Sequence, residues 1–126
     1  MAKSYRATTS NISRQMAKLR ADIPDTMSGF SAMARAATRP GTLDTKTKEL
    51  IALALGVAAH CDGCIGFHMQ ALIKAGASRA EITEALAMAV YMGGGPSVMY
   101  AAGALEAVDQ VVKSRVRPVA QAANSP

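Results

Sequence analysis

The stretch from Glu49 to Ala59 restricts the fold of this chain more than any other segment. It reads ELIALALGVAA, which is longer than a typical strand of about five or six residues. Its Ala and Leu residues have high helix propensity, so we predict a buried helix here. The composition agrees, because half of the 126 residues are hydrophobic while aromatic residues make up only 4% and Trp is absent. Such a mixture favours helices that pack closely through small side chains, and no strand pattern competes with it.

Capping and breaking signals divide the chain into five or six predicted helices. One is expected from Asn11 to Asp22, where Ile12, Met16 and Leu19 lie at helical spacing before Pro24 ends the helix. The others are a helix capped by Asp25, the buried helix beginning at Asp44 or Thr45, a helix from about Asp62 to Ala75 closed by Gly76, one behind a Ser78–Glu81 capping box, and a last one from Pro96. The predicted fold class is therefore all-α.

The same signals predict three parts along the chain. The sequence Arg39-Pro40-Gly41 is a clear break between helices. We expect the helices within residues 1–38 to form an interface and residues 39–116 to form the core. Residues 117–126 are expected to be a disordered tail.

Charge and hydropathy exclude two classes of partner. The net charge is +5, but the cations are spread along the chain and no aromatic residues interleave with them, so we expect no nucleic-acid binding. No apolar run reaches the roughly 20 residues of a membrane span, and the first eleven residues are polar, unlike a signal peptide. We therefore expect a cytoplasmic protein that does not enter the membrane. Two cysteines fit such a reducing compartment.

The chemistry-bearing segment contains Cys61, Cys64 and His68. If a helix begins near Cys61, at roughly 100° per residue Cys64 lies about 60° from Cys61 around the axis and His68 about 20° from it, so the three side chains form one stripe. The unpaired N–H groups of the first helical turn and a nearby imidazole both favour a thiolate. A pair of cysteines at this spacing can also form a disulfide. The pattern predicts a redox-active dithiol.

Glu49 is the one acid of the preceding apolar helix, where burial of an unpaired carboxylate would be costly. His68 is its natural partner. We therefore predict a proton relay that runs from Glu49 through His68 to a cysteine. An ordinary exposed acid at Glu49, which follows Lys46 and Lys48, is the alternative interpretation.

These residues and their flanks resemble the AhpD-like proteins of the carboxymuconolactone decarboxylase superfamily. The shared pattern is Glu49, eleven residues, Cys61-Asp62-Gly63-Cys64, three residues and His68. The flanking sequences KELIALA, CIGFH and KAGA, and the Gly93-Gly94-Gly95-Pro96 segment, are similar as well. The resemblance covers about Arg39 to Val108.

The resemblance implies an AhpD-like helical bundle that assembles into trimers or hexamers and acts as a peroxidase or disulfide reductase. It implies that Cys64 attacks a hydroperoxide and becomes a sulfenic acid, which Cys61 resolves to a disulfide. An external dithiol, such as a lipoylated protein, would then reduce this disulfide, and Glu49 and His68 would relay protons. Such an antioxidant cycle needs no cofactor and no metal.

One position departs from the founding members, which carry a second His immediately before the second cysteine, where this chain has Gly63. His60 precedes Cys61, and we interpret it as a loop or interface residue. Three other readings stay open. The cysteines could be buried structural thiols; Cys61, Cys64, His68 and either His60 or Glu49 could bind zinc in a non-catalytic helical oligomer; or the protein could be a carboxymuconolactone decarboxylase-like lyase, although such members typically lack the cysteine pair.

Overall fold

The predicted all-α fold is confirmed by the computed structural model, which describes residues 3–124 and the side chains of residues 3–112. Within these residues there are six helices and no strand. The helices are α1 (Tyr5–Asp22), α2 (Pro24–Thr38), α3 (Thr45–Ala58), α4 (Asp62–Lys74), α5 (Arg79–Gly93) and α6 (Gly95–Asn124). No helix in this described part of the chain combines the length and the hydrophobicity that crossing a membrane requires.

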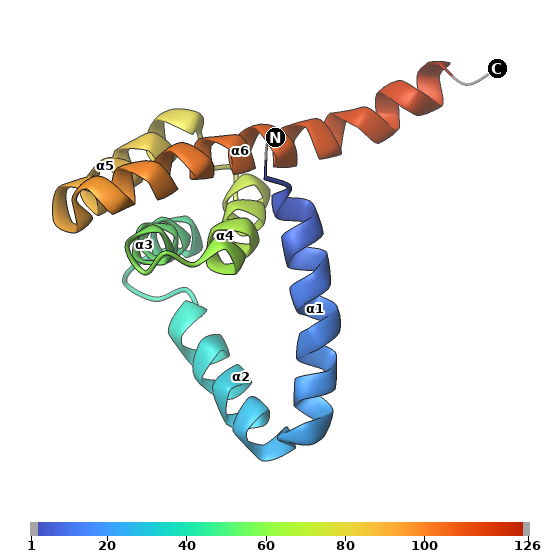
Figure 1. Cartoon of the computed structure of the whole chain (residues 1–126), viewed down its shortest axis with the longest axis vertical. Coiled ribbons are helices and arrows are strands. Elements are labelled where there is room, and N and C mark those ends of the chain that lie inside the picture. The colour runs from blue at the N-terminus through green and yellow to red at the C-terminus, as the bar shows by residue number, and fades with distance from the viewer. Residues whose placement is uncertain (1–2, 125–126) are drawn as a thin grey trace.

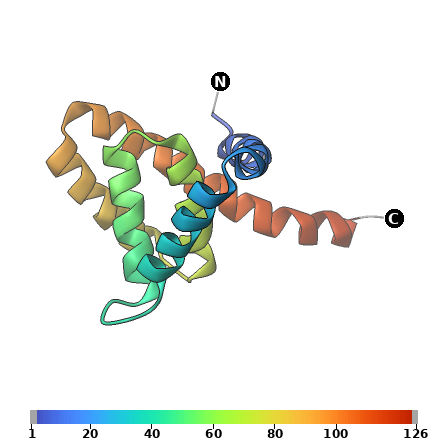
Figure 2. The same cartoon turned by 90° about the horizontal axis from the view of Figure 1, so that it is seen from below.

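Helices α3 to α6 form a bundle, and α1 and α2 form a V that reaches away from it (Figures 1 and 2). Helix α3 packs against α4 and α5, and α6 also contacts α4 and α5. Helix α1 joins the bundle mainly through α4, at the end where Tyr5 and Thr9 are buried. Helix α2 contains no buried residue. The bundle is therefore the packed unit, and α1 is attached to it along α4.

The core lies between α3, α4, α5 and α6 and consists of aliphatic side chains and alanines. Its largest fully buried members are Leu53, Val57, Ile65, Met69, Leu72 and Ile82. On α6, Ala104 and Ala107 are also fully buried. Small side chains at these positions let α6 approach its neighbours closely, as the composition suggested.

Most of the predicted helix boundaries are confirmed. Asp44 caps α3 by accepting a hydrogen bond from the Thr47 N–H, and Ser78 and Glu81 form the capping box of α5. Gly76, at φ +81°, follows the end of α4, where its N–H donates to the Ile73 carbonyl.

Three boundaries differ from the predictions. Helix α1 begins at Tyr5 rather than Asn11, because the Ser4 hydroxyl caps it. Helix α2 begins at Pro24, whose fixed φ suits the first helical position, and Asp25 lies in its first turn instead of capping it. The last helix continues to Asn124, into the segment 117–126 for which the sequence predicted a disordered tail. The alanines near its end are strong helix formers, and residues 125–126 lie outside the described residues.

Candidate redox site

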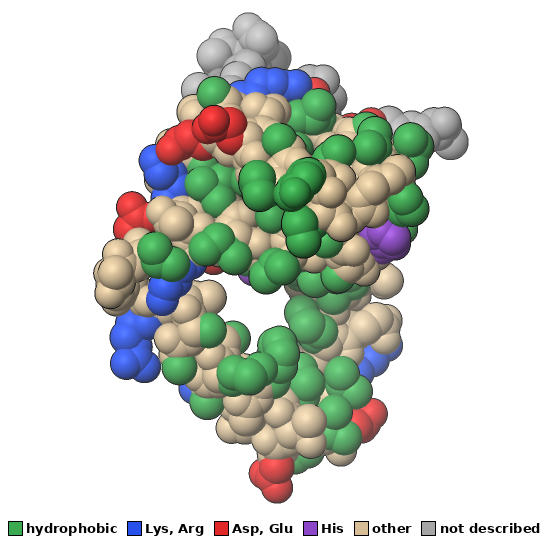
Figure 3. Space-filling view, turned by 90° about the vertical axis from the view of Figure 1, so that its left-hand side faces the viewer, with side chains coloured by type: hydrophobic (Ala, Val, Ile, Leu, Met, Phe, Trp, Pro, Cys, Tyr) green, Lys and Arg blue, Asp and Glu red, His purple; other side chains and the backbone are tan. Residues whose placement is uncertain are grey.

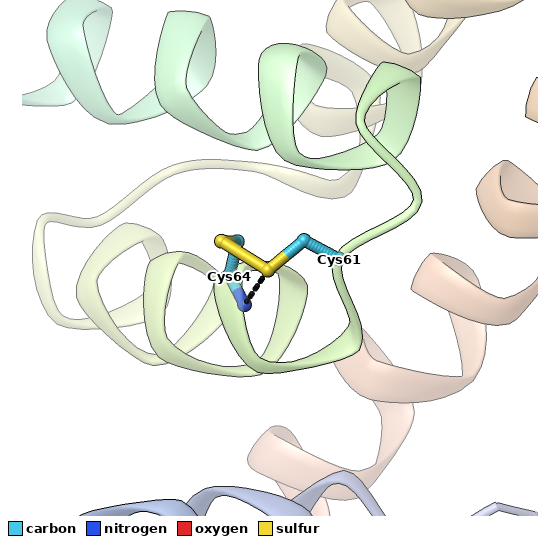
Figure 4. Close-up of a disulfide and its surroundings, with 2 residues drawn as sticks. All are labelled: Cys61 and Cys64. Atoms are coloured by element: carbon cyan, nitrogen blue, oxygen red, sulfur yellow. Dashed lines mark hydrogen bonds between the residues drawn. A yellow bond between two sulfur atoms is a disulfide. The ribbon is translucent and has the colours of Figure 1, made fainter. Parts of the chain in front are cut away.

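A disulfide joins Cys61 and Cys64 at the start of α4, with 5.2 Å between the two Cα atoms (Figure 4). Cys61 is the N-cap of the helix, in extended backbone geometry, and Cys64 lies in the first turn. The Cys61 Sγ accepts a hydrogen bond from the Cys64 N–H at 3.1 Å. The sulfur thus takes the place of the usual capping oxygen and uses one of the otherwise unpaired N–H groups at the helix start. The predicted helix start near Cys61 is confirmed, since α4 begins at Asp62, and the disulfide joins the first two members of the expected stripe.

The turn before Cys61 places both cysteines against α3. His60 adopts φ 56°, a left-handed conformation in which glycine is usual, and its N–H donates to the Val57 carbonyl while the Cys61 N–H donates to that of Gly56. The His60 ring stacks on Tyr100 of α6, with 4.6 Å between ring centroids. Gly56 lets the helices approach, since a Cβ there would lie 3.0 Å from the Cys64 Cβ.

Glu49 of α3 and His68 of α4 lie side by side, with 2.6 Å between the Glu49 Oε2 and the His68 Nδ1. The Glu49 side chain is 12% exposed and that of His68 is 32% exposed. Glu49 is therefore not the exposed acid of the alternative interpretation. The side chain of the neighbouring Lys48 instead donates hydrogen bonds to the carbonyls of Ala37 and Arg39, at the end of α2. Within the described residues, no hydrogen bond joins His68 to either sulfur.

Helix α1 lies against the dipeptide between the cysteines. A Cβ at Gly63 would lie 2.7 Å from the Cδ1 of Ile12, and a Cβ at Gly66 would lie 2.5 Å from the Thr9 methyl. The absence of side chains at these two positions of α4 is what allows α1 to touch its backbone. Two glycines three residues apart on one helix face were the sequence signal for this contact, which our reading of the sequence missed.

The dipeptide is also held by Lys3, which the sequence reasoning did not single out. The Lys3 Nζ donates to the Asp62 Oδ2 at 2.8 Å, and this hydrogen bond raises the pKa of Lys3. The ammonium lies 5.9 Å from the ring centroid of Tyr5 and 5.8 Å from that of Tyr100. The other carboxylate oxygen of Asp62, Oδ1, is buried and has no hydrogen-bond partner among the described residues.

The residues of the alternative zinc reading do not form a metal site among the described residues. The two sulfurs are bonded to each other, which leaves neither of them as a thiolate ligand. Among the described residues there is no group of three or more His, Cys, Asp or Glu side chains that could hold a metal ion.

Comparison with known proteins identifies relatives of the whole bundle. The model of the carboxymuconolactone decarboxylase family matches residues 24–107, which leaves α1 before the matched region. A carboxymuconolactone decarboxylase family protein from Legionella pneumophila has 58% sequence identity and superposes with a TM-score of 0.83, covering 85% of this chain and 96% of that one.

Two more relatives are less similar. A family member from Thermotoga maritima, described as "possibly involved in antioxidative response", has 28% identity and a TM-score of 0.79, with coverage of 88% of this chain and 95% of that one. An uncharacterized protein of Cupriavidus necator is 39% identical over 109 residues, which are 86% of this chain and 96% of the relative.

Proposed function

This chain belongs to the carboxymuconolactone decarboxylase family, and we propose that it is a thiol-dependent hydroperoxide reductase of that family. The observation that carries the proposal is the Cys61–Cys64 disulfide at the start of a helix whose next turn bears His68, paired with Glu49. A disulfide across one helical turn, at an N-terminus that stabilises thiolates, is the arrangement of dithiols that cycle between two redox states.

In the proposed cycle Cys64 attacks and Cys61 resolves. The Cys64 thiolate attacks one oxygen of a hydroperoxide ROOH, the O–O bond breaks, and the departing alkoxide takes up a proton and leaves as ROH. Cys64 is then a sulfenic acid. The Cys61 thiolate attacks the Cys64 sulfur, water leaves and the disulfide forms. An external dithiol supplies two electrons and two protons, is itself oxidised to a disulfide, and restores both thiols.

Glu49 and His68 are proposed to move the protons of this cycle. The short contact between them occupies one imidazole nitrogen, Nδ1, so the other nitrogen, Nε2, is the one left to exchange protons with a thiol. Among the hydrogen bonds of the described residues none joins His68 to a sulfur of the disulfide, which fits a transfer through water or one made only after reduction.

The reductant and the assembly belong to the same proposal. A small dithiol or a lipoylated protein has the chemistry to reduce a disulfide of this kind. We also propose that the protein assembles with copies of itself, since α2 has no buried residue and exposes Phe30 and Met33. A cytoplasmic location would supply the reducing surroundings that the cycle requires.

The test is peroxide consumption by the purified protein with dihydrolipoamide as reductant. We expect Cys64→Ser to abolish turnover, because it removes the attacking sulfur. With the reductant left out, we expect Cys61→Ser to consume one equivalent of peroxide and stop, leaving a sulfenic acid that dimedone labels. The chain has only two cysteines, so a thiol count before and after mild peroxide follows the disulfide directly.

Full turnover by both variants would overturn the proposal. A muconolactone-type substrate serves as the control for lyase chemistry. Decarboxylation that persists in both Cys→Ser variants, without peroxide turnover in the parent protein, would favour the lyase reading instead.

A further inference from the structure

Asp62 is a carboxylate placed between two sulfurs that must ionise in order to react. It follows Cys61 directly and lies in the first turn of α4, close to the N–H groups there. One of its oxygens is buried without a partner among the described residues, and the other binds the Lys3 ammonium. The described structure therefore offers Lys3 as the cation that offsets this carboxylate.

An unpaired Asp62 would oppose the chemistry of the dithiol. A negative charge a few ångströms from a sulfur disfavours the thiolate. The Asp62 carboxylate also competes with the thiolate for stabilisation by the positive N-terminal end of the α4 dipole. A cation bound to the carboxylate opposes this effect.

Contacts with α6 and α4 hold the segment around Lys3 where its ammonium can reach Asp62. The Gln110 side chain of α6 accepts a hydrogen bond from the Tyr5 N–H at 2.9 Å and donates to the Lys3 carbonyl at 2.5 Å. Buried Tyr5 anchors the same segment, and further along α1 Ile12 lies against Gly63, the residue after Asp62. Backbone and side-chain contacts from α1, α4 and α6 thus hold the segment that carries the ammonium next to Asp62.

We propose that Lys3 is a positioning residue for the dithiol: by pairing with Asp62, it keeps that carboxylate from opposing thiolate formation at Cys61 and Cys64. The inference rests on the proposed function only in assuming that the thiols react with a peroxide. The effect of Lys3 on thiolate formation does not depend on that function. The inference also assigns a role to a residue ahead of the family-matched region.

Other charged or titratable groups surround the site, and the test has to separate Lys3 from them. They come from α1, α3, α4, α6 and the turn before Cys61, and are Tyr5, Glu49, His68, Tyr100, Glu106 and His60. None of the substitutions below changes any of these groups.

The experiment measures the rate of iodoacetamide alkylation of the reduced protein as a function of pH. For Lys3→Met we expect the rate at neutral pH to fall about three- to tenfold and the pH profile to move to higher pH, the size of effect that one nearby charge exerts at a partly exposed site. Lys3→Arg should keep the rate of the parent protein. Lys18→Met removes the same charge from the exposed part of α1 and should change nothing.

A thermodynamic cycle with Asp62→Asn separates electrostatics from structure. In the Asp62→Asn background, Lys3→Met should have no further effect on alkylation, because the charge it offsets is gone. The proposal would be wrong if Lys3→Met slowed alkylation equally in the parent and Asp62→Asn backgrounds, or slowed it in neither. Alkylation reports the thiolate with no peroxide present, so a protein that shows this pattern but consumes no peroxide would refute the proposed function and support this inference.

Discussion

The contact between Glu49 and His68 joins two neighbouring helices through one pair of side chains, 2.6 Å apart. The carboxylate is mostly buried, so its loss would leave the imidazole without the group that orients it. The Lys3–Asp62 contact likewise pairs two charged side chains beside the disulfide.

At the residue scale we predict the effect of Glu49→Gln. The amide keeps the shape of the side chain but not its charge, so peroxide turnover, measured as kcat/KM, should fall about ten- to hundredfold. Glu84→Gln on the exposed side of α5 is the matched control and should retain the parent value. Equal kcat/KM values for Glu49→Gln and Glu84→Gln would contradict a role for Glu49 in proton transfer.

Helix α4 is the element on which the site depends, because it carries both cysteines and His68 and is contacted by α1, α3 and α6. Two glycines on it face α1, and Gly56 on α3 faces Cys64. The site therefore depends on close backbone approach of α4 to α1 on one side and to α3 on the other.

At the element scale we predict opposite effects for two Gly→Ala substitutions. A methyl at Gly66 would meet the Thr9 side chain and approach the Tyr5 carbonyl, so Gly66→Ala should lower the free energy of unfolding by about 1–2 kcal/mol. A methyl at Gly29 of α2 would meet nothing within 4 Å, so Gly29→Ala should raise it by about 0.5–1 kcal/mol through helix propensity.

Urea unfolding of the reduced proteins, followed by circular dichroism, measures both changes. If Gly66→Ala were as stable as Gly29→Ala, the close contact between α1 and α4 would not exist in solution.

The molecule as a whole leaves a large part of its apolar surface uncovered. Figure 3 shows hydrophobic side chains gathered on one face of the bundle, above an opening between the bundle and the α1–α2 pair. The exposed large side chains include Phe30, Met33, Leu55, Met88, Tyr91, Met92 and Met99. Between α5 and α6 lies an apolar groove of about 330 Å³, lined by residues such as Leu86, Val90 and Leu105. Surfaces of this kind mark interfaces.

At this scale we predict a self-assembled particle whose mass is a multiple of 13.1 kDa. Light scattering after size exclusion should show it at micromolar concentration. Phe30→Glu should lower the mass, since it puts a charge on the uncovered face of α2. Ser28→Glu, which adds the same charge to the same exposed helix, is the control. A monomeric parent protein would contradict the prediction.

Much of the fold follows from local rules that the sequence contains by itself. Helix propensity, apolar spacing and caps such as Asp44 and Ser78 act over a few residues, so they predicted the helices and most of their ends. The pairing of Glu49 with His68 was also within reach, because a lone acid in an apolar helix needs a partner.

Only the tertiary structure decided what surrounds the dithiol on its other side. Lys3 and Asp62 are 59 residues apart, and Tyr5 and Gln110 are 105 apart. No periodicity or capping rule reaches over such distances, because these contacts depend on how α1 and α6 pack against α4. The stretch from Glu49 to Ala59 predicted a buried helix, but only one face of α3 is buried, at Leu53, Gly56 and Val57, while Leu55 is exposed. The packing of α1 on Gly63 and Gly66 determined which charges lie next to the Cys61–Cys64 turn.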